Sequence, residues 1–433
     1  MSVLYWAYKA LGTAGGIALI PPWWLHHLLK GRDLGRIYQR IGLYPQILRM
    51  QLKAPVGVWL HAASVGEVGV AAAIVKSLAT LQPGCRLALS SVTEQGIGRA
   101  RAVFGDKIPG FYAPLDIDGP NQIALRMVRP SVLGLLETEI WPNLIIAAHR
   151  MGVRIALLNG RISVRSIRKY RKIRSLMRHT LDHVDAFSMI SAEDADRIAS
   201  LGAPRDRILV NGNAKFDGAA ETADTSARHW ATALFNLDPG TPVIVAGSTR
   251  HPEEIYLLDA YMEISRDFPE TVLILAPRHT ARVPQIEGWI KARGLISQKR
   301  SQLGTDRPRR ANIVLLDTMG ELSATYSIAD FVFCGGSLVP KGGQNVLEPA
   351  IRGKAVMHGP SMEDFGDAGD LIRRAGGSVM VRDAREVAAV AMQWLRSPHR
   401  VRAMGEAARR AILAHRGAAA KHAQVLDRLL NQA

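Results

Sequence analysis

The hydrophobic and polar positions from residue 56 onward alternate between two patterns. Short apolar runs of strand length, beginning with VGVWLHA, are followed by segments with helical periodicity, beginning with VGVAAAIVKSLAT. Further apolar runs in this half of the chain are RLALSSV, SVLGLLE, RIALLNG, AFSMI and DRILVNG. Strands separated by helices of about ten residues predict right-handed βαβ units and a parallel sheet.

The pattern pauses at residues 218–228, GAAETADTSAR, which are small, polar and aperiodic. It then resumes with the apolar runs PVIVAGS, TVLILAPR, NIVLLDT, FVFCGGS, KAVMHGP and SVMV, and ends in an alanine-rich helical tail. We therefore expect an α/β protein with two sequential, doubly wound, Rossmann-like domains and a cleft between them. The expected boundaries are 46–217 for the first domain, 218–228 for the linker and 229–433 for the second domain.

The first 45 residues predict a membrane anchor with a basic juxtamembrane segment. The segment from Leu11 to Leu29 is apolar apart from two histidines, and Pro21 and Pro22 interrupt it. Basic residues follow on one side, at Lys30, Arg32, Arg36 and Arg40. The positive-inside rule places the rest of the chain in the cytoplasm. Length alone leaves open a spanning signal anchor and an anchor lying in the membrane plane, with a buried hairpin as a third alternative.

The charge balance predicts an anionic partner. The chain of 433 residues carries 55 Lys and Arg against 38 Asp and Glu, a formal net charge of +17. Nucleic acid, an anionic membrane and phosphorylated substrates all fit such an excess. Aromatic residues are only 6%, and no zinc-finger, RNP-type or basic-zipper pattern occurs, so we expect no nucleic-acid partner. The two cysteines, Cys85 and Cys334, show no ligand spacing, which indicates a reduced compartment without structural zinc.

Ligands of open parallel sheets bind outside the carboxyl ends of the strands, so the strand-to-helix turns are the expected sites of chemistry. In the second domain, LLDTMGEL and CGGSLVPKGGQNVLEPA combine glycines with a helix start, whose free N–H groups suit a phosphate. We place the second of these helix starts at Asn345, with Glu348 in position for ribose hydroxyls. Arg278 and His279 follow another strand and also suit a phosphate. Taken singly, these are also ordinary turn glycines, a helix-start acid and a surface arginine, but together they predict a nucleotide site.

The first domain combines acids with a basic stretch. Glu67, Glu137 and Glu139 follow predicted strands, and the residues from Arg161 to Arg178 include six arginines and two lysines. The basic stretch is either a solvated helix face or a site for acceptor phosphates or anionic lipid.

Several short sequence patterns allow more than one interpretation or give only a weak signal. Ser64 and Glu67 form the S-x-x-E pattern of a capping box, so Glu67 is either a helix cap or a catalytic acid. The D-x-D pair Asp116 and Asp118 is a weak metal signal, and the histidine pair at 179 and 183 lacks the glutamate of H-E-x-x-H. The dinucleotide fingerprint GxGxxG is missing, which argues against a nicotinamide enzyme.

The motifs HAASVGE, ETEIWPN, NGRISVRS, GNAKFD, GST, PRH, DTMGELSATYSIAD and GGSLVPKGGQNVLEPA together resemble those of the 3-deoxy-D-manno-octulosonic acid (Kdo) transferases of lipopolysaccharide synthesis. The resemblance extends from the N-terminal segment to Phe365 and beyond. It implies a GT-B glycosyltransferase fold, an inverting transfer from CMP-Kdo to a lipid A precursor (lipid IVA), and attachment to the cytoplasmic face of the inner membrane. No metal or other cofactor is expected. Another nucleotide-sugar enzyme of this fold, such as an epimerase, and a non-enzymatic membrane or nucleic-acid binder are the alternatives.

The resemblance also assigns residues by position. Glu67 would be the general base, and Glu137 and Lys215 would stabilise the transition state. The residues that would bind CMP are Arg278, His279, Met319, Gly320, Glu321, Asn345, Val346, Leu347 and Glu348. The residues expected to contact the acceptor are Ser64, Arg161, Ser163 and Arg165. The chain departs from the family pattern at Thr280-Ala281, Arg250 and Asp364, where Pro-Glu, His and Asn are usual.

Overall fold

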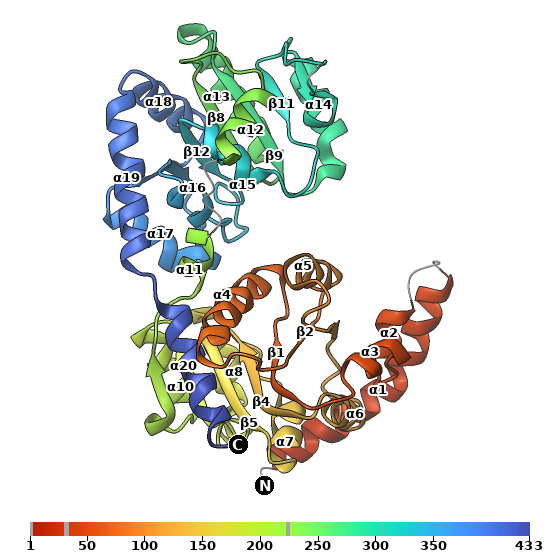
Figure 1. Cartoon of the computed structure of the whole chain (residues 1–433). Coiled ribbons are helices and arrows are strands. Elements are labelled where there is room, and N and C mark those ends of the chain that lie inside the picture. Colours follow the sequence, from red (N-terminus) through yellow and green to blue (C-terminus); the bar gives the residue numbers. More distant parts are fainter. Residues whose placement is uncertain (1–2, 30–33, 222–225, 305) are drawn as a thin grey trace. The chain divides into compact units, whose positions relative to one another are not determined.

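The structure is a computed structural model that describes residues 3–29, 34–221, 226–304 and 306–433 (Figure 1). The chain forms two compact units. Unit 1 comprises Met1–Gly218 and Arg416–Ala433, and unit 2 comprises Ala219–His415. Each unit is built on a seven-stranded sheet whose neighbouring strands are all parallel. The predicted pair of parallel-sheet α/β domains is therefore confirmed.

The sheet of unit 1 has the strand order β3-β2-β1-β4-β5-β6-β7. Its strands are β1 (Val56–His61), β2 (Leu87–Ser91), β3 (Gly110–Tyr112), β4 (Pro130–Leu136), β5 (Arg154–Gly160), β6 (Ala186–Met189) and β7 (Ile208–Val210). The order reverses between β1 and β4, where Val58 pairs with Val132 and His61 with Leu135. A reversal of this kind leaves a crevice at the carboxyl ends of the two central strands, so the turns after β1 and β4 are the expected ligand site.

Helices cover both faces of this sheet. One face carries α4 (Val65–Leu81), α5 (Glu94–Phe104) and α20 (Ala418–Leu430), and the other carries α6 (Asp118–Val128), α7 (Pro142–Arg150), α9 (Arg174–Leu181) and α10 (Ala192–Leu201). In α4, Val68, Ala71, Ile74 and Leu78 recur at helical spacing and are all buried. Full burial of each larger aliphatic side chain contributes about 1.5–3 kcal/mol, which is what holds the helices on the sheet.

The C-terminal helix α20 packs beside α4 on unit 1 (Figure 1). Its small residues Ala419 and Ala423 are buried against the sheet, which lets the two helices approach closely. The carboxylate of Asp217 accepts hydrogen bonds from the N–H groups of Gly417 and Ala419 at 2.7 and 2.9 Å. We had placed residues 229–433 in one domain, whereas residues 416–433 group with unit 1. Of the expected linker, residues 222–225 lie outside the described residues, and the rest belongs to the helices α11 (Lys215–Glu221) and α12 (Ser226–Leu234).

The sheet of unit 2 has the order β10-β11-β9-β8-β12-β13-β14. Its strands are β8 (Val243–Thr249), β9 (Val272–Pro277), β10 (Ser297–Lys299), β11 (Ile313–Leu315), β12 (Phe331–Cys334), β13 (Ala355–His358) and β14 (Ser378–Met380). Helices α13 (Glu253–Asp267), α14 (Val283–Ala292) and α18 (Ala384–Leu395) pack on one face, and α12 packs on the other. The remaining helices of this unit are α15 (Leu322–Thr325), α16 (Leu347–Ile351), α17 (Gly366–Arg374) and α19 (Pro398–Ala414).

Short 3-10 helices connect several of these elements. They are η1 (Arg205–Arg207), η2 (Thr280–Arg282), η3 (Arg300–Gln302), η4 (Tyr326–Ile328) and η5 (Glu363–Phe365).

The N-terminal segment forms one helix, α1 (Val3–Leu29), with Pro21 and Pro22 inside it, followed by α2 (Gly35–Arg40) and α3 (Gln46–Gln51). The alternative of a buried hairpin is therefore wrong. Across the described ranges of the chain, no helix combines the length and the apolar character needed to cross a membrane. Two contacts fix α1 to unit 1: the Tyr8 hydroxyl donates to Asp116 at 2.8 Å, and Lys9 pairs with Asp118 at 2.9 Å.

Candidate active site

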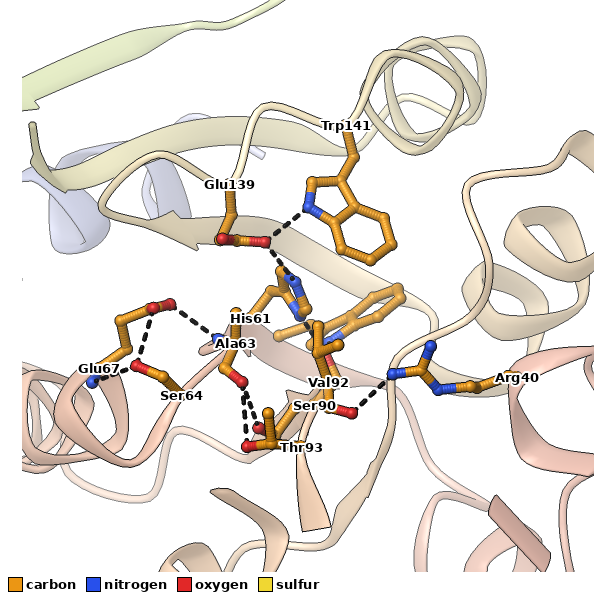
Figure 2. Close-up of polar contacts among 12 residues, drawn as sticks. Arg40, His61, Ala63, Ser64, Glu67, Ser90, Val92, Thr93, Glu139 and Trp141 are labelled. Atoms are coloured by element: carbon orange, nitrogen blue, oxygen red, sulfur yellow. Dashed lines mark hydrogen bonds and ion pairs between the residues drawn. The ribbon is translucent and has the colours of Figure 1, made fainter. Parts of the chain in front are cut away.

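The turn after β1 buries the carboxyl group of Glu67 at the start of α4 (Figure 2). Ser64 is the N-cap residue, and its hydroxyl oxygen accepts from the Glu67 N–H at 3.4 Å. The same hydroxyl donates to one carboxylate oxygen of Glu67 at 3.0 Å, and the Ala63 N–H donates to the other at 2.7 Å. Glu67 is only 8% exposed. Ser64 therefore both caps the helix and holds the carboxyl group in place.

The surroundings of Glu67 make it a stronger base than an ordinary carboxylate. Burial, followed by the negative charges of Glu137 and Glu139, raises the pKa of Glu67 to about 8, while the hydrogen bonds from Ala63 and Ser64 lower it by less. A base whose pKa lies near the working pH combines a usable ionised fraction with a strong pull on a proton. This environment fits proton transfer from a hydroxyl group.

Glu137 and Lys215 form an ion pair beside Glu67. The Lys215 Nζ lies 2.6 Å from the Glu137 Oε1, and both side chains are mostly buried. Glu137 has φ of 54°, in the left-handed region that residues other than glycine seldom occupy. Lys215 begins α11, where the Ala214 N–H donates to the side chain of Asn159 at 2.8 Å. Backbone strain held by surrounding contacts is typical of a functional site.

A second hydrogen-bonded group is centred on Glu139, which lies on the same turn as Glu137. His61, the last residue of β1, contacts Ser90 on β2 and Glu139 after β4, and Trp141 also donates to Glu139 (Figure 2). The sequence singled out Glu139 only as an acid after a strand and missed His61, Ser90 and Trp141. The one available signal was a polar residue, His61, at the end of an apolar strand.

The basic stretch forms α8 (Val164–Lys172) and most of α9. Ile167 is buried and Tyr170 packs on the core, while the exposed side is made of Arg168, Lys169, Arg171, Lys172 and Arg174. Burial and then the charge of Glu139 raise the pKa of Tyr170, so α8 lies close to the acids of the site.

The four residues expected to contact the acceptor differ in what the structure shows of them. Ser64 holds Glu67, and Ser163 is the N-cap of α8, where it accepts from the Ser166 N–H at 3.0 Å. Arg161 is partly buried at the start of this stretch, and the side chain of Arg165 lies outside the described part of the structure. The acceptor role of all four stays a prediction.

The two weak metal signals have structural explanations. The Asp116 carboxylate accepts from the N–H groups of Asn143 and Leu144 at 3.1 and 2.8 Å and thereby caps α7. Asp118 pairs with Lys9. The rings of the histidines at 179 and 183 pack edge to face, with centroids 5.1 Å apart. In the parts of the chain that the structure describes, no group of three or more His, Cys, Asp or Glu side chains is arranged to hold a metal ion.

The candidate nucleotide residues of unit 2 lie at the carboxyl edge of its sheet. Arg278 and His279 are exposed after β9, and the Arg278 N–H donates to the Thr249 carbonyl at 3.0 Å. After β11, Met319 is 76% exposed and Gly320 has φ of 88°, so this turn is open to solvent. Glu321 is already engaged by Arg300 at 2.8 Å.

The turn before α16 is organised by side chains. The helix begins at Leu347, two residues later than expected, and just before it the Asn345 side chain accepts from the Leu347 N–H at 3.0 Å. The Asn345 amide also donates to Glu348 at 2.9 Å. Val346 and Leu347 are fully buried, so neither side chain is exposed to a ligand.

The first part of the loop GGSLVPKGG, before the expected phosphate site at the helix start, is held by an acid of unit 2. The N–H groups of Gly336, Ser337 and Leu338 all donate to the buried carboxylate of Glu253, at 2.6, 2.8 and 2.9 Å. These donors are therefore satisfied from within the chain. A Cβ at Gly335 would lie 2.5 Å from the Ser248 carbonyl oxygen, so glycine is needed there for the close approach of the two turns.

Comparison with known proteins identifies a family and relatives that cover most of the chain. A family profile described as 3-Deoxy-D-manno-octulosonic-acid transferase (kdotransferase) matches residues 35–218. The 3-deoxy-D-manno-octulosonic acid transferase of Bordetella pertussis is 32% identical over 385 residues, which cover 87% of each chain. The enzyme of the same name from Haemophilus influenzae is 30% identical over 390 residues, which cover 88% of each chain.

One relative is a longer protein, and only part of it matches this chain. A bifunctional glycosyltransferase/methyltransferase of Fusobacterium nucleatum is 36% identical over 321 residues, or 73% of this chain, and the chain spans 49% of that protein's length.

Two solved structures share the fold over most of the chain. A glycosyltransferase from Rickettsia africae has a TM-score of 0.60 at 12% identity, covering 88% of this chain and all of that chain. The UDP-GlcNAc 2-epimerase from Neisseria meningitidis has a TM-score of 0.59 at 12% identity, covering 87% of this chain and all of that chain. At this identity the likeness is one of fold alone, and it is shared by transferases and epimerases.

Proposed function

The chain belongs to the 3-deoxy-D-manno-octulosonic acid transferase family, and from this premise we propose that it moves Kdo from CMP-Kdo to a lipid A precursor, lipid IVA, with inversion at the transferred sugar. The activity is a glycosyl transfer of lipopolysaccharide core synthesis. We assign the reaction to the turn after β1 on one observation. The carboxyl group of Glu67 is buried there, at the carboxyl end of β1 and beside the Glu137–Lys215 pair.

In the proposed reaction, Glu67 accepts the proton of a sugar hydroxyl of the acceptor. The hydroxyl oxygen forms a bond to the anomeric carbon of Kdo, and the bond from that carbon to the phosphate oxygen breaks. CMP leaves with the electron pair of that bond, so it needs positive groups and N–H donors rather than an acid. Positive charge develops on the sugar ring, where the carboxylate of Glu137 stabilises it, and Lys215 keeps that carboxylate ionised and in place.

We assign donor binding to unit 2. Arg278 and His279 lie exposed at a strand end and suit the phosphate, since the arginine presents a fork of donors. The open turn of Met319, Gly320 and Glu321 presents backbone groups. The remaining assigned residues are Asn345, Val346, Leu347 and Glu348, whose carboxylate is of the type that accepts from ribose hydroxyls.

We assign the acceptor and the membrane surface to unit 1. The exposed basic side chains of α8 suit the phosphates of a lipid A precursor or an anionic bilayer, and α8 lies close to Glu139. Large apolar side chains are exposed along α1, at Leu4, Trp6, Leu11, Leu19, Leu25, Leu28 and Leu29. An apolar helix face beside basic residues favours an anchor that lies in the membrane plane, on the cytoplasmic face of the inner membrane.

The experiment that tests the proposed function combines the protein with CMP-Kdo and lipid IVA and follows the product masses. We expect CMP release that depends on the lipid acceptor, together with products heavier than lipid IVA by one or more Kdo units. CMP release without an acceptor, or epimerised nucleotide sugar without a lipid product, would contradict the proposal.

Lys215→Met should lower the rate of Kdo transfer by about ten- to a hundred-fold, because Glu137 then stays buried without its 2.6 Å partner and is no longer held in position. Steady-state transfer assays measure this loss, and Lys215→Arg, which keeps the charge, should recover part of the rate. The exposed Lys107→Met serves as the control for loss of a positive charge in unit 1. Wild-type rates in Lys215→Met would remove this residue from the mechanism.

Leu11→Glu together with Leu19→Glu should weaken binding to vesicles of anionic lipid by about ten-fold or more, because both side chains are largely exposed on α1 and would meet the bilayer. Vesicle co-sedimentation measures the affinity. Ile296→Glu changes an equally exposed apolar side chain of unit 2 and should leave the affinity for vesicles unchanged. Equal losses in both variants would argue against α1 as the membrane contact.

A further inference from the structure

Glu139 lies in the turn after β4, and two donors from different elements hold its carboxylate (Figure 2). The Trp141 Nε1 donates to it at 2.6 Å, and the His61 Nε2 lies 3.4 Å from the same oxygen. The His61 and Trp141 rings pack edge to face, with centroids 5.0 Å apart, so each ring limits the rotation of the other. The carboxylate therefore has a fixed position and two N–H groups directed at it.

The contacts of His61 favour a proton on the ring nitrogen that faces Glu139. The indole Nε1 of Trp59 is only ever a donor, and it lies 2.8 Å from the Ser90 hydroxyl oxygen. The hydroxyl proton of Ser90 is then directed to the Nδ1 of His61, 2.9 Å away. With Nδ1 accepting, the neutral imidazole carries its proton on Nε2, which faces Glu139. Trp59, Ser90 and His61 are completely buried, so water does not compete for these bonds.

We propose that Glu139 is a positioning residue of the transfer reaction, which acts on the general base Glu67 through its negative charge. The hydrogen-bonded chain from Trp59 through Ser90 to His61 keeps Glu139 in its ionised form. This inference rests on the proposed function, in which Glu67 accepts the proton of the acceptor hydroxyl.

The electrostatics of the two acids agree with this arrangement. Burial raises the pKa of Glu139, but its interactions with His61 and its hydrogen bond from Trp141 lower it by more, so that it lies below the usual range. Glu139 is in turn one of the groups that raise the pKa of Glu67, after burial and Glu137. One residue is thus held as an anion, and its charge makes a neighbouring carboxyl group a stronger base.

Other titratable groups face the same two acids and differ in their net effect. Glu137, on the same turn as Glu139, is paired with Lys215 at 2.6 Å, so much of its charge is compensated. Tyr170 of α8 faces Glu139, and burial together with that charge raises its pKa, which keeps the phenol neutral. His61 contributes a hydrogen bond and a favourable charge interaction to Glu139. Glu139 is therefore the acid near Glu67 that a histidine and an indole, rather than a lysine, hold in place.

The chemical consequence concerns both the strength and the ionisation of the base. A carboxylate of higher pKa removes a proton from a sugar hydroxyl more effectively, but it is ionised only at higher pH. Glu139 therefore sets the maximal rate and also the pH below which the rate falls. A residue that merely supported the fold would lower the rate without moving that pH.

Glu139→Gln tests the inference through the pH dependence of kcat for Kdo transfer. In the wild type, the rate should fall as the pH drops through the pKa of Glu67. Without the charge of Glu139 the midpoint of this fall should move to lower pH by about half a unit or more, and the maximal rate should drop a few-fold because the base is weaker. Glu94→Gln, which removes an exposed acid at the start of α5, should leave the midpoint unchanged.

His61 is tested in two backgrounds. His61→Phe removes the donor, so Glu139 is protonated at higher pH and the midpoint should move in the direction seen for Glu139→Gln. His61→Gln keeps an amide donor for Glu139 and should restore the midpoint toward the wild-type value. In the Glu139→Gln background, His61→Phe should cause no further shift, because the charge through which His61 acts is gone.

Two results would overturn the inference. One is a wild-type midpoint in Glu139→Gln, which tests the inference even when the buried His61 variants do not fold. The other is an additive shift of His61→Phe in the Glu139→Gln background. Glu67→Gln separates these results from a failure of the proposed function: normal transfer in Glu67→Gln contradicts the base itself. An inactive Glu67→Gln beside an unshifted Glu139→Gln contradicts only the role of Glu139.

Discussion

Glu67→Gln should lower the rate of Kdo transfer by about a hundred- to ten-thousand-fold, the usual contribution of a positioned general base. The glutamine has the same shape, and its amide oxygen is still able to accept from the Ala63 N–H, so the turn should keep its conformation. CMP affinity should stay within about two-fold of the wild type, because the assigned nucleotide residues all belong to unit 2. Rapid-quench transfer assays and CMP titration by calorimetry measure the two quantities.

Glu67→Gln should also change how the stability of the folded state depends on pH. The pKa of Glu67 is about 8 in the folded chain against an ordinary 4.5, so the folded state binds more protons between these values. Ionisation of Glu67 therefore destabilises the fold, by nothing below about pH 4.5 and fully above about pH 8, up to roughly 4 kcal/mol. Glu67→Gln should thus be more stable than the wild type above pH 8, with the difference closing as the pH falls.

Glu94→Gln is the matched control for both measurements, since Glu94 is an exposed acid in the first turn of the neighbouring helix α5. It should change neither the transfer rate nor the pH dependence of thermal unfolding. Near-normal turnover in Glu67→Gln would show that this carboxyl group is only a helix cap.

The sequence presented the cap and the base as alternatives, but the structure shows that one residue has the geometry for both. The Ser64 hydroxyl caps α4 and also donates to the carboxylate, which fixes Glu67 in a buried position. Spacing reveals a capping box because it is a local pattern. It does not reveal that burial and two further acids raise the pKa of Glu67, since these come from strands and helices distant in sequence.

The interior strands were predictable because they are buried on both faces and appear as continuous apolar runs. The two strands that we missed, β3 (Gly110–Tyr112) and β10 (Ser297–Lys299), are three-residue edge strands. An edge strand needs apolar residues on one face at most, so SQK gave no signal. The position of α20 on unit 1 was equally invisible, because a helical alanine-rich pattern indicates an apolar face but not its partner.

The candidate site was also predictable only in part. Turns that follow strands were identified from local motifs, and the structure places Glu67, Glu137 and Lys215 together at one sheet edge. Contacts between distant turns were not predictable. His61 and Glu139 meet only because β1 and β4 are neighbours, and the donors in GGSLVPKGG are satisfied by an acid that lies 83 residues earlier.

Substitution of that acid, Glu253, is the second change for which we expect a large effect, in this case on stability. Its two carboxylate oxygens accept four backbone N–H groups, those of Arg250, Gly336, Ser337 and Leu338. Glu253→Gln replaces one acceptor oxygen by an NH₂ group that faces N–H donors, and the donors of Gly336 and Ser337 are buried away from water. We expect a loss of about 3–5 kcal/mol in the stability of unit 2, since breaking a buried charged network leaves its partners unsatisfied.

Hydrogen exchange locates this loss, because it should appear in the amides of β8, β12 and α13 while unit 1 keeps its protection. Glu263→Gln is the matched control: Glu263 is an exposed acid on the same helix and should change stability by less than about 0.5 kcal/mol. A Glu253→Gln protein with wild-type protection in the Gly336–Leu338 turn would mean that the backbone of this turn holds its shape without the carboxylate. The N–H groups of Gly336, Ser337 and Leu338 would then be available to a ligand.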